Sequence, residues 1–233
     1  MVFINRRAFL AVSLAALAAP ALADDDKDNT LILVTKHGKV VIRLRPDLAP
    51  KTVAQIKTLT KRKFYDGIVF HRVIPDFMAQ TGDPTGTGSG GSDLPNIPAE
   101  FTATHFKRGT VGMARSSEPN SANSQFFICL GDAGFLDNKY AVFGEVVSGM
   151  EAVDKIKAGT ADNNGAVDNP DKIVTLRLAS DVKPKADDAA APEDKPKSED
   201  KAKAKKPKPK KTPASDAPAA PADQPTDAPA SQD

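Results

Sequence analysis

Short apolar runs near the start of the chain predict two β-strands joined by a tight turn. Residues 31–34 and 39–44 are rich in Leu, Ile and Val, and the dipeptide His37-Gly38 lies between them. Runs of β-branched residues bounded by turn residues are typical of neighbouring strands. The strand pattern then ends at Pro46.

The next segment has the spacing of an amphipathic helix. After Pro50, the apolar residues Val53, Ile56 and Leu59 recur at every third position with polar residues between them. This spacing places the three side chains on one helical face, and proline is favoured in the first turn of a helix. We therefore expect a helix over residues 51–63.

Further short runs rich in β-branched and aromatic residues predict more strands. They cover residues 68–73, 110–114, 125–130, 141–147 and 173–178. A second helix fits residues 150–156, which glycines flank on both sides. Many short strands with only two helices favour a β-barrel over alternating βαβ units. The loops at 81–101 and 116–124 are rich in Gly, Pro, Ser and Asn, and we expect them to form the rim of a surface groove.

The N-terminus has the pattern of a cleaved secretory signal peptide. Residues 1–23 contain Arg6 and Arg7, an apolar run and an Ala-x-Ala sequence before three aspartates. The apolar run is too short to span a bilayer comfortably. We expect an exported, periplasmic protein whose mature chain starts at Asp24, with either the Sec or the twin-arginine pathway as its export route.

The C-terminal residues 181–233 consist mostly of Lys, Asp, Ala and Pro and contain no aromatic residue. Such a segment cannot bury enough apolar surface to offset the entropy of ordering, so we expect a disordered tail. Between residues 201 and 211 lie seven lysines and no acid, a block that either contacts anionic cell-envelope polymer or is a solvated spacer. Residues 24–180 are expected to form one compact domain.

The charge of the chain does not favour a polyanionic partner. The formal net charge is +2, and removal of residues 1–23, which hold two arginines and no acid, lowers it to 0. Nucleic acid and anionic membrane surfaces attract an excess of basic residues, so neither is expected as a partner. Cys129 is the single cysteine and cannot form an internal disulfide, and the apolar residues around it favour a buried small side chain over a reactive thiol.

Patterns for metal and nucleotide sites are missing from the sequence. The glycine-rich segment 86–91 lacks the Lys-Ser/Thr pair of a phosphate-binding loop. His37, His71 and His105 are far apart without ligand-like spacing, so no metal or cofactor is expected. We expect His71 to be a hydrogen-bonded barrel residue rather than a general base.

The segment 70–80 holds the most informative chemistry of the chain. It places the guanidinium of Arg72 and the side-chain amide of Gln80 close in sequence to Phe77 and Met78. These groups can grip an apolar ring beside a peptide bond. The segment has no obvious nucleophile with a base, so it can act through electrostatics and shape.

Several blocks of the sequence, taken in order, resemble one protein family. The blocks are Phe64-Tyr65-Asp66-Gly67, residues 70–80, residues 82–88, Gly112-Met113-Ala114-Arg115, residues 123–128 and Phe135-Leu136-Asp137. From about residue 31 to residue 178 the chain resembles the cyclophilin family of peptidyl-prolyl isomerases. The resemblance implies a mainly β fold, a closed eight-stranded antiparallel β-barrel capped by two α-helices, and acceleration of rotation about X-Pro peptide bonds.

The resemblance also implies roles for individual residues. Arg72 matches the family's catalytic arginine, and Gln80 matches the amide that binds the substrate backbone and steadies the arginine. The positions that match the walls of the proline pocket are Phe77, Met78, Phe127 and Leu136. The positions that match the rest of the substrate-binding groove are Ala114, Arg115, Gln125, Phe135 and Tyr140, with Arg115 offering its backbone groups to the residue before proline.

Three positions depart from the pattern of the best-known eukaryotic members. Phe135 stands where many members have a tryptophan that helps to bind the inhibitor cyclosporin, Tyr140 replaces a histidine, and Arg115 replaces an asparagine. Loss of the indole N–H removes a donor without emptying the pocket, so we expect catalysis to survive and cyclosporin to bind weakly. Arg115 is expected to alter the preference for residues that flank proline.

Taken together, the sequence predicts a monomeric, exported isomerase that acts on proline-containing unfolded or partly folded polypeptides without a cofactor or metal. Two alternatives stay open. One is a proline-binding module that grips peptides without useful turnover, and the other is a tethered protein whose function lies in the lysine-rich tail. The sequence does not identify the client proteins.

Overall fold

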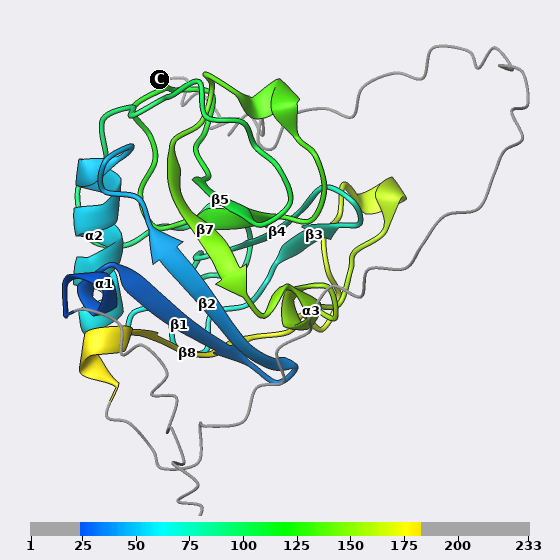
Figure 1. Ribbon diagram of the computed structural model, residues 1–233. Coiled ribbons are helices and arrows are strands. Elements are labelled where there is room, and N and C mark those ends of the chain that lie inside the picture. Colours follow the sequence, from blue (N-terminus) through cyan, green and yellow to red (C-terminus); the bar gives the residue numbers. More distant parts are fainter. Residues whose placement is uncertain (1–23, 183–233) are drawn as a thin grey trace, which may run out of the picture.

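One antiparallel β-sheet organises the protein. The computed structural model describes residues 24–182, and in this part eight strands form one curled sheet in the order β3-β4-β6-β5-β7-β2-β1-β8 (Figure 1). In chain order the elements are α1 (Asp24–Asp28), β1 (Thr30–Thr35), β2 (Gly38–Leu44), α2 (Pro50–Lys61), β3 (Arg72–Ile74), β4 (Met78–Thr81), β5 (Thr110–Met113), β6 (Phe126–Cys129), η1 (Gly134–Leu136), β7 (Val142–Ser148), α3 (Met150–Val153), η2 (Ala161–Asn163), β8 (Ile173–Leu178) and η3 (Ala179–Asp181). The predicted signal peptide, residues 1–23, and the predicted tail from residue 183 onward lie outside the described residues.

The two edges of the sheet approach each other. Val69, just before β3, and Lys172, just before β8, form an isolated antiparallel bridge. Backbone hydrogen bonds also run from Phe70 N to Asp171 O and from Ile173 N to Ile68 O, each 2.8 Å long. The predicted mainly β, antiparallel fold is confirmed. Complete closure of the barrel stays a prediction, because β3 and β8 themselves share no ladder.

The first hairpin and the first helix are confirmed. Strands β1 and β2 pair antiparallel from Thr30↔Arg43 to Thr35↔Gly38. Helix α2 contacts β7 and β8 along one side of the sheet (Figure 1). The predicted apolar face of α2 is buried, as its Val53, Ile56 and Leu59 show.

Helix α2 is capped from a distant loop. The residue before it, Ala49, offers no side-chain acceptor. Instead the carboxylate of Glu100 accepts hydrogen bonds from Lys51 N at 2.9 Å and from Thr52 N and Oγ1 at 2.8 Å. These bonds satisfy backbone donors that every helix leaves open at its N-terminus, and the negative charge suits the positive end of the helix dipole. Glu100 thereby joins the groove loop 81–101 to the body of the fold.

Apart from the short helices η1, η2 and η3, two strands and two α-helices show the main differences from the sequence prediction. Strand β4 was not predicted, because all four of its residues are buried and show no alternation of polar and apolar positions. Of the predicted strand 68–73, only the last two residues belong to β3. The residues before them form individual backbone hydrogen bonds with residues 171–173 instead of a strand ladder. Helix α3 ends at Val153 instead of Ile156, and the short helix α1 was also not predicted.

Buried apolar side chains gather on both faces of the sheet. The larger cluster includes Val73, Ala79, Val111 and Ile128. A second cluster includes Cys129 together with all four predicted proline-pocket residues. Burial raises the pKa of the Cys129 thiol to about 12, which agrees with a buried, unreactive side chain. Within residues 24–182, no helix is both long and apolar enough to cross a bilayer.

Candidate active site

The register of four strands brings the predicted catalytic residues into one row. Arg72 pairs with Gln80, Gln80 pairs with Phe127, and Phe127 pairs with Gly112 across β3, β4, β6 and β5. Residues opposite each other in a sheet point to the same face, and the next residue along each strand points to the other face. The neighbouring row from Val73 to Val111 belongs to the larger cluster, so Arg72, Gln80 and Phe127 share the opposite face.

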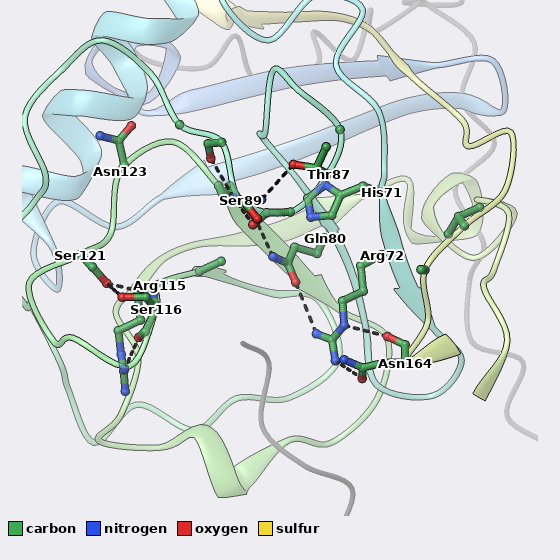
Figure 2. A pocket seen from close by; sticks show the side chains of 18 of the residues that line it. His71, Arg72, Gln80, Thr87, Ser89, Arg115, Ser116, Ser121, Asn123 and Asn164 are labelled. Carbon is green, nitrogen blue, oxygen red and sulfur yellow. Dashed lines mark hydrogen bonds between the residues drawn. The ribbon is translucent and has the colours of Figure 1, made fainter. Parts of the chain in front are cut away.

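The guanidinium of Arg72 is fixed by three acceptor oxygens from two residues. Its Nε donates to Asn164 O and its Nη2 donates to Asn164 Oδ1, each at 2.9 Å, while Nη1 donates to Gln80 Oε1 at 3.4 Å (Figure 2). Burial lowers the pKa of Arg72 from its ordinary value, and the nearby Tyr140 opposes this shift. An arginine starts from so high a pKa that the group keeps its proton. The site therefore holds a fixed, partly buried positive charge.

A relay of side-chain amides continues from Arg72 into the glycine-rich loop. Gln80 Nε2 donates to Gln125 Oε1 at 2.9 Å. Gln125 Nε2 in turn donates to the carbonyl oxygens of Gly88 and Gly90, each at 2.8 Å. Gln80 and Gln125, both predicted site residues, are thus joined directly to each other, and Gln80 links Gln125 to Arg72.

Asp83 organises the glycine-rich loop that the relay reaches. Its buried carboxylate accepts hydrogen bonds from Thr85 N at 2.7 Å, Gly88 N at 2.6 Å and Gly90 N at 3.1 Å. Burial by itself would raise the pKa of Asp83, but these donors and the Thr85 hydroxyl outweigh it and lower the pKa. A Cβ at Gly90 would collide with Asp83 Oδ1, so this position requires glycine.

A cavity of about 800 Å³ opens between this loop and the segment that follows β5. Five predicted residues line it: Arg72, Gln80, Ala114, Arg115 and Gln125. The other lining residues are mostly polar and come from the ranges 86–92, 116–123 and 163–168, together with His71 and Asn96. The apolar residues of the predicted proline pocket are not among them. The cavity is therefore the polar half of the site.

The apolar half is a packed cluster beside the cavity. Phe77, Met78, Phe127, Leu136 and Tyr140 belong to it, and Ala114 connects it to the cavity. The Phe127 ring lies 6.0 Å from the Tyr140 ring in a perpendicular arrangement, and the Phe77 ring lies 5.2 Å from Phe135. The structure brings these predicted residues together, and their role as a proline pocket stays a prediction.

Exposure differs sharply within the apolar half. Met78, Phe127 and Leu136 have no exposed surface, whereas Phe77 is 5% and Phe135 is 39% exposed. Among these residues, solvent therefore reaches the apolar half mainly at Phe135, with a small exposed area at Phe77.

Arg115 uses its side chain to join its own loop to the segment that leads into β7. Its Nε donates to Lys139 O at 3.1 Å, and its Nη1 donates to Ser116 O at 2.7 Å. Its guanidinium carbon lies 4.7 Å from the centre of the Tyr140 ring, a cation–π distance. The side chain thus holds the cavity wall in place, which is compatible with the predicted use of its backbone groups.

The expectation of a hydrogen-bonded His71 is wrong. The ring is buried and borders the cavity, and neither ring nitrogen has a partner of hydrogen-bonding geometry among the described residues. Burial lowers the pKa of His71; Asp83 and the Val69 backbone oppose the shift, and Arg72 adds to it. The lowered pKa favours the neutral form of His71, whose ring lies beside Gly88 at the cavity.

Asn164 is the residue at this site that the sequence did not reveal. It lies 92 positions after Arg72, and the Asn164-Gly165 dipeptide predicts a turn and nothing about its neighbours.

The part of the chain that the structure describes holds no group of three or more His, Cys, Asp or Glu side chains suited to a metal ion.

The fold and the site together combine a curled antiparallel sheet with a fixed positive charge, side-chain amides and apolar rings beside one cavity. The family model of the cyclophilin type peptidyl-prolyl cis-trans isomerases matches residues 30–178. The chain belongs to this family, and its activity is peptidyl-prolyl cis-trans isomerisation.

Individual relatives and solved structures agree with this family. A probable peptidyl-prolyl cis-trans isomerase of Brucella suis is 54% identical over 187 residues, which cover 76% of this chain and 94% of the relative. A peptidyl-prolyl cis-trans isomerase of Schizosaccharomyces pombe is 41% identical over 146 residues, covering 61% of this chain and 94% of the relative. The crystal structure of a cyclophilin from Hirschia baltica matches with a TM-score of 0.61 and 28% identity, over 68% of this chain and 77% of that one. A Cryptosporidium parvum cyclophilin type isomerase, crystallised in the presence of the dipeptide Ala-Pro, matches with a TM-score of 0.58 and 26% identity, over 64% of this chain and 98% of that one.

Proposed function

We propose that this isomerase accelerates rotation of X-Pro bonds in unfolded or partly folded exported proteins, with Arg72 donating to the proline nitrogen in the twisted transition state. The proposal depends on the position of Arg72 between the polar cavity and the apolar half of the site. Its guanidinium borders the polar cavity, and Tyr140 of the apolar half is close enough to influence its pKa. A peptide that lies in the cavity with its proline ring on Phe77 would meet this charge at the imide bond.

A donor at the proline nitrogen supplies one part of the acceleration. Rotation breaks amide resonance at a cost of about 18–20 kcal/mol, and the proline nitrogen then gains a basic lone pair. A charged N–H aimed at this lone pair stabilises the twisted state more than either planar state, which is the condition for catalysis. Loss of one such preorganised donor typically costs about 10²- to 10³-fold in rate.

The apolar half supplies the other part of the acceleration. A proline ring seated on Phe77 and Phe135 would be held while the preceding residue turns, because the amides of Gln80 and Gln125 offer polar partners for the peptide backbone on the cavity side. Ala-Pro is the dipeptide named with the Cryptosporidium parvum structure, which supports a short X-Pro segment as the unit of recognition.

The test is a protease-coupled isomerisation assay on a short Ala-Pro peptide. We expect Arg72→Ala to lower kcat/KM about 100-fold or more, with an unchanged near-UV circular dichroism spectrum. Arg62→Ala is the matched control, because this exposed arginine follows α2 and pairs with Asp93. Wild-type rates in Arg72→Ala would remove Arg72 from the mechanism, and wild-type protein that binds the peptide without isomerising it would support a holdase instead.

Export, a periplasmic location and a monomeric state belong to the same proposal. The motif in residues 1–23 supports export, and mass spectrometry of the protein from a periplasmic extract should find Asp24 as its first residue. Cyclosporin is proposed to bind weakly, because Phe135 lacks the N–H donor of a tryptophan.

A further inference from the structure

The loop between α3 and β8 runs beside β3 and is attached to it by the backbone. Gly159 N donates to Val73 O at 3.0 Å, Val73 N donates to Gly165 O at 2.8 Å, and Val167 N donates to His71 O at 3.0 Å. An isolated bridge between Arg72 and Ala166 lies in the same stretch. These bonds fix the loop at the level of the Arg72 side chain.

Within this loop, Asn164 occupies a conformation that few residues adopt. Its φ is 48° and that of Gly165 is 79°, so both lie in the left-handed region. Asparagine tolerates this region better than most residues with a side chain. A Cβ at Gly165 would collide with the side chain of Ile74, so the turn packs directly on β3.

Asn164 holds one whole edge of the Arg72 guanidinium. The N–H of Nε and one N–H of Nη2 point in the same direction along this edge, and Asn164 accepts them with its backbone oxygen and its Oδ1 at 2.9 Å each (Figure 2). The bond from Nη1 to Gln80 is longer, at 3.4 Å. A guanidinium has five N–H donors, so these bonds leave two of them, one on each Nη, for a substrate.

We propose that Asn164 is a positioning residue of the isomerase, whose side-chain oxygen sets the orientation of the Arg72 guanidinium. This inference rests on the proposed function of Arg72. A free arginine side chain has large rotamer entropy, and a charge that must first be oriented stabilises a transition state less than one already in place. Gln80 alone cannot orient the group, because one long bond leaves the guanidinium free to rotate about it.

Three variants isolate the side-chain oxygen from the rest of the turn. Asn164→Gly removes Oδ1 but keeps the backbone oxygen and is compatible with a positive φ. Asn164→Asp keeps an acceptor at the same place. Asn169→Gly is the matched control, because Asn169 has a φ of 50° in the same loop, is exposed, and does not line the cavity.

We expect Asn164→Gly to lower kcat about tenfold with little change in KM, because only the donor's orientation in the transition state is lost. Asn164→Asp should restore the rate to within about threefold of the wild type, and Asn169→Gly should match the wild type. In the Arg72→Ala background, measured at raised enzyme concentration, Asn164→Gly should cause no further loss, because Asn164 acts through Arg72.

Two results would overturn the proposal. One is a loss that persists at full size in the Arg72→Ala background, and the other is a tenfold loss in Asn164→Asp as well, since both indicate a structural role of the turn. The NMR signal of the Arg72 Nη2–H group, which donates to Asn164 Oδ1, gives an independent measurement. It should broaden or exchange faster with water in Asn164→Gly but not in Asn169→Gly, and an unchanged signal contradicts the proposal. If Arg72→Ala itself keeps full activity, the proposed function fails, and this NMR comparison still decides whether Asn164 orients the guanidinium.

Discussion

The polar and apolar halves of the site are held in place by different forces. Arg72, Gln80 and Gln125 are oriented by a chain of hydrogen bonds of 2.8–3.4 Å that ends on Asn164 and on the glycine-rich loop. The apolar half is held by close packing around Phe127, which has no exposed surface. Directional bonds fix orientation, whereas packing fixes volume. Substitution of Arg72 in the polar half should therefore mainly lower activity, and substitution of Phe127 in the apolar half should mainly lower stability.

The largest expected loss of stability is at Phe127. Its ring lies 5.8 Å from Phe106 and 6.0 Å from Tyr140, and a Cβ at Gly112 would come within 2.6 Å of it. Phe127→Ala would leave a cavity in a fully buried place, so we expect a loss of about 3–5 kcal/mol in the free energy of unfolding. Urea unfolding followed by fluorescence or circular dichroism measures this value.

The comparison between the halves predicts a contrast with Arg72→Ala. Phe127→Leu should lose much less stability than Phe127→Ala because it refills most of the volume. Arg72→Ala should lose little stability and most of its activity. A Phe127→Ala protein that unfolds at the urea concentration of the wild type would show that the cluster is not closely packed around this ring.

A smaller effect, limited to the polar half, is expected at Asp83. The two carboxylate oxygens accept from separate sets of donors, Thr85 on one side and Gly88 and Gly90 on the other. An amide has only one oxygen, so Asp83→Asn must turn its NH₂ group towards one of these sets. We expect a loss of about 1–3 kcal/mol and faster hydrogen exchange at Gly88 and Gly90.

The stabilisation by Asp83 should also depend on pH. Its pKa is lowered in the folded state, so the stabilisation is complete above the ordinary value of 3.8 and is lost as the pH falls through the lower folded value. The difference in unfolding free energy between wild type and Asp83→Asn should shrink below about pH 4, because asparagine does not titrate. Asp171, whose pKa is lowered to about 2, is present in both proteins and cancels. A constant difference from pH 7 to pH 3 would contradict this account.

The two halves also differ in how well a sequence predicts them. The apolar half and the row from Arg72 to Phe127 come from continuous blocks, so their residues could be named by resemblance. The supports of the polar half come from far away: Asn164 follows Arg72 by 92 residues, and Glu100 caps α2 from 48 residues beyond Thr52. No local pattern encodes such contacts, because an Asn-Gly pair or a lone glutamate is equally suited to any exposed turn. Strand β4 was not predicted for a related reason. Both of its faces are buried, so its residues do not alternate between polar and apolar positions.

The smallest effect is expected at Phe135, where the apolar half meets solvent. The ring is 39% exposed and packs at 5.2 Å against Phe77, so a tryptophan can replace it without displacing buried neighbours. We expect Phe135→Trp to change kcat/KM for an Ala-Pro peptide by less than about twofold, because the Arg72 donor is untouched. The same variant should bind cyclosporin more tightly, since the indole adds an N–H donor at an accessible position. Isothermal titration with cyclosporin and the coupled assay measure the two effects separately. A large gain in turnover would show that this exposed ring takes part in the twisted state, and an unchanged cyclosporin affinity would show that the missing donor does not limit binding.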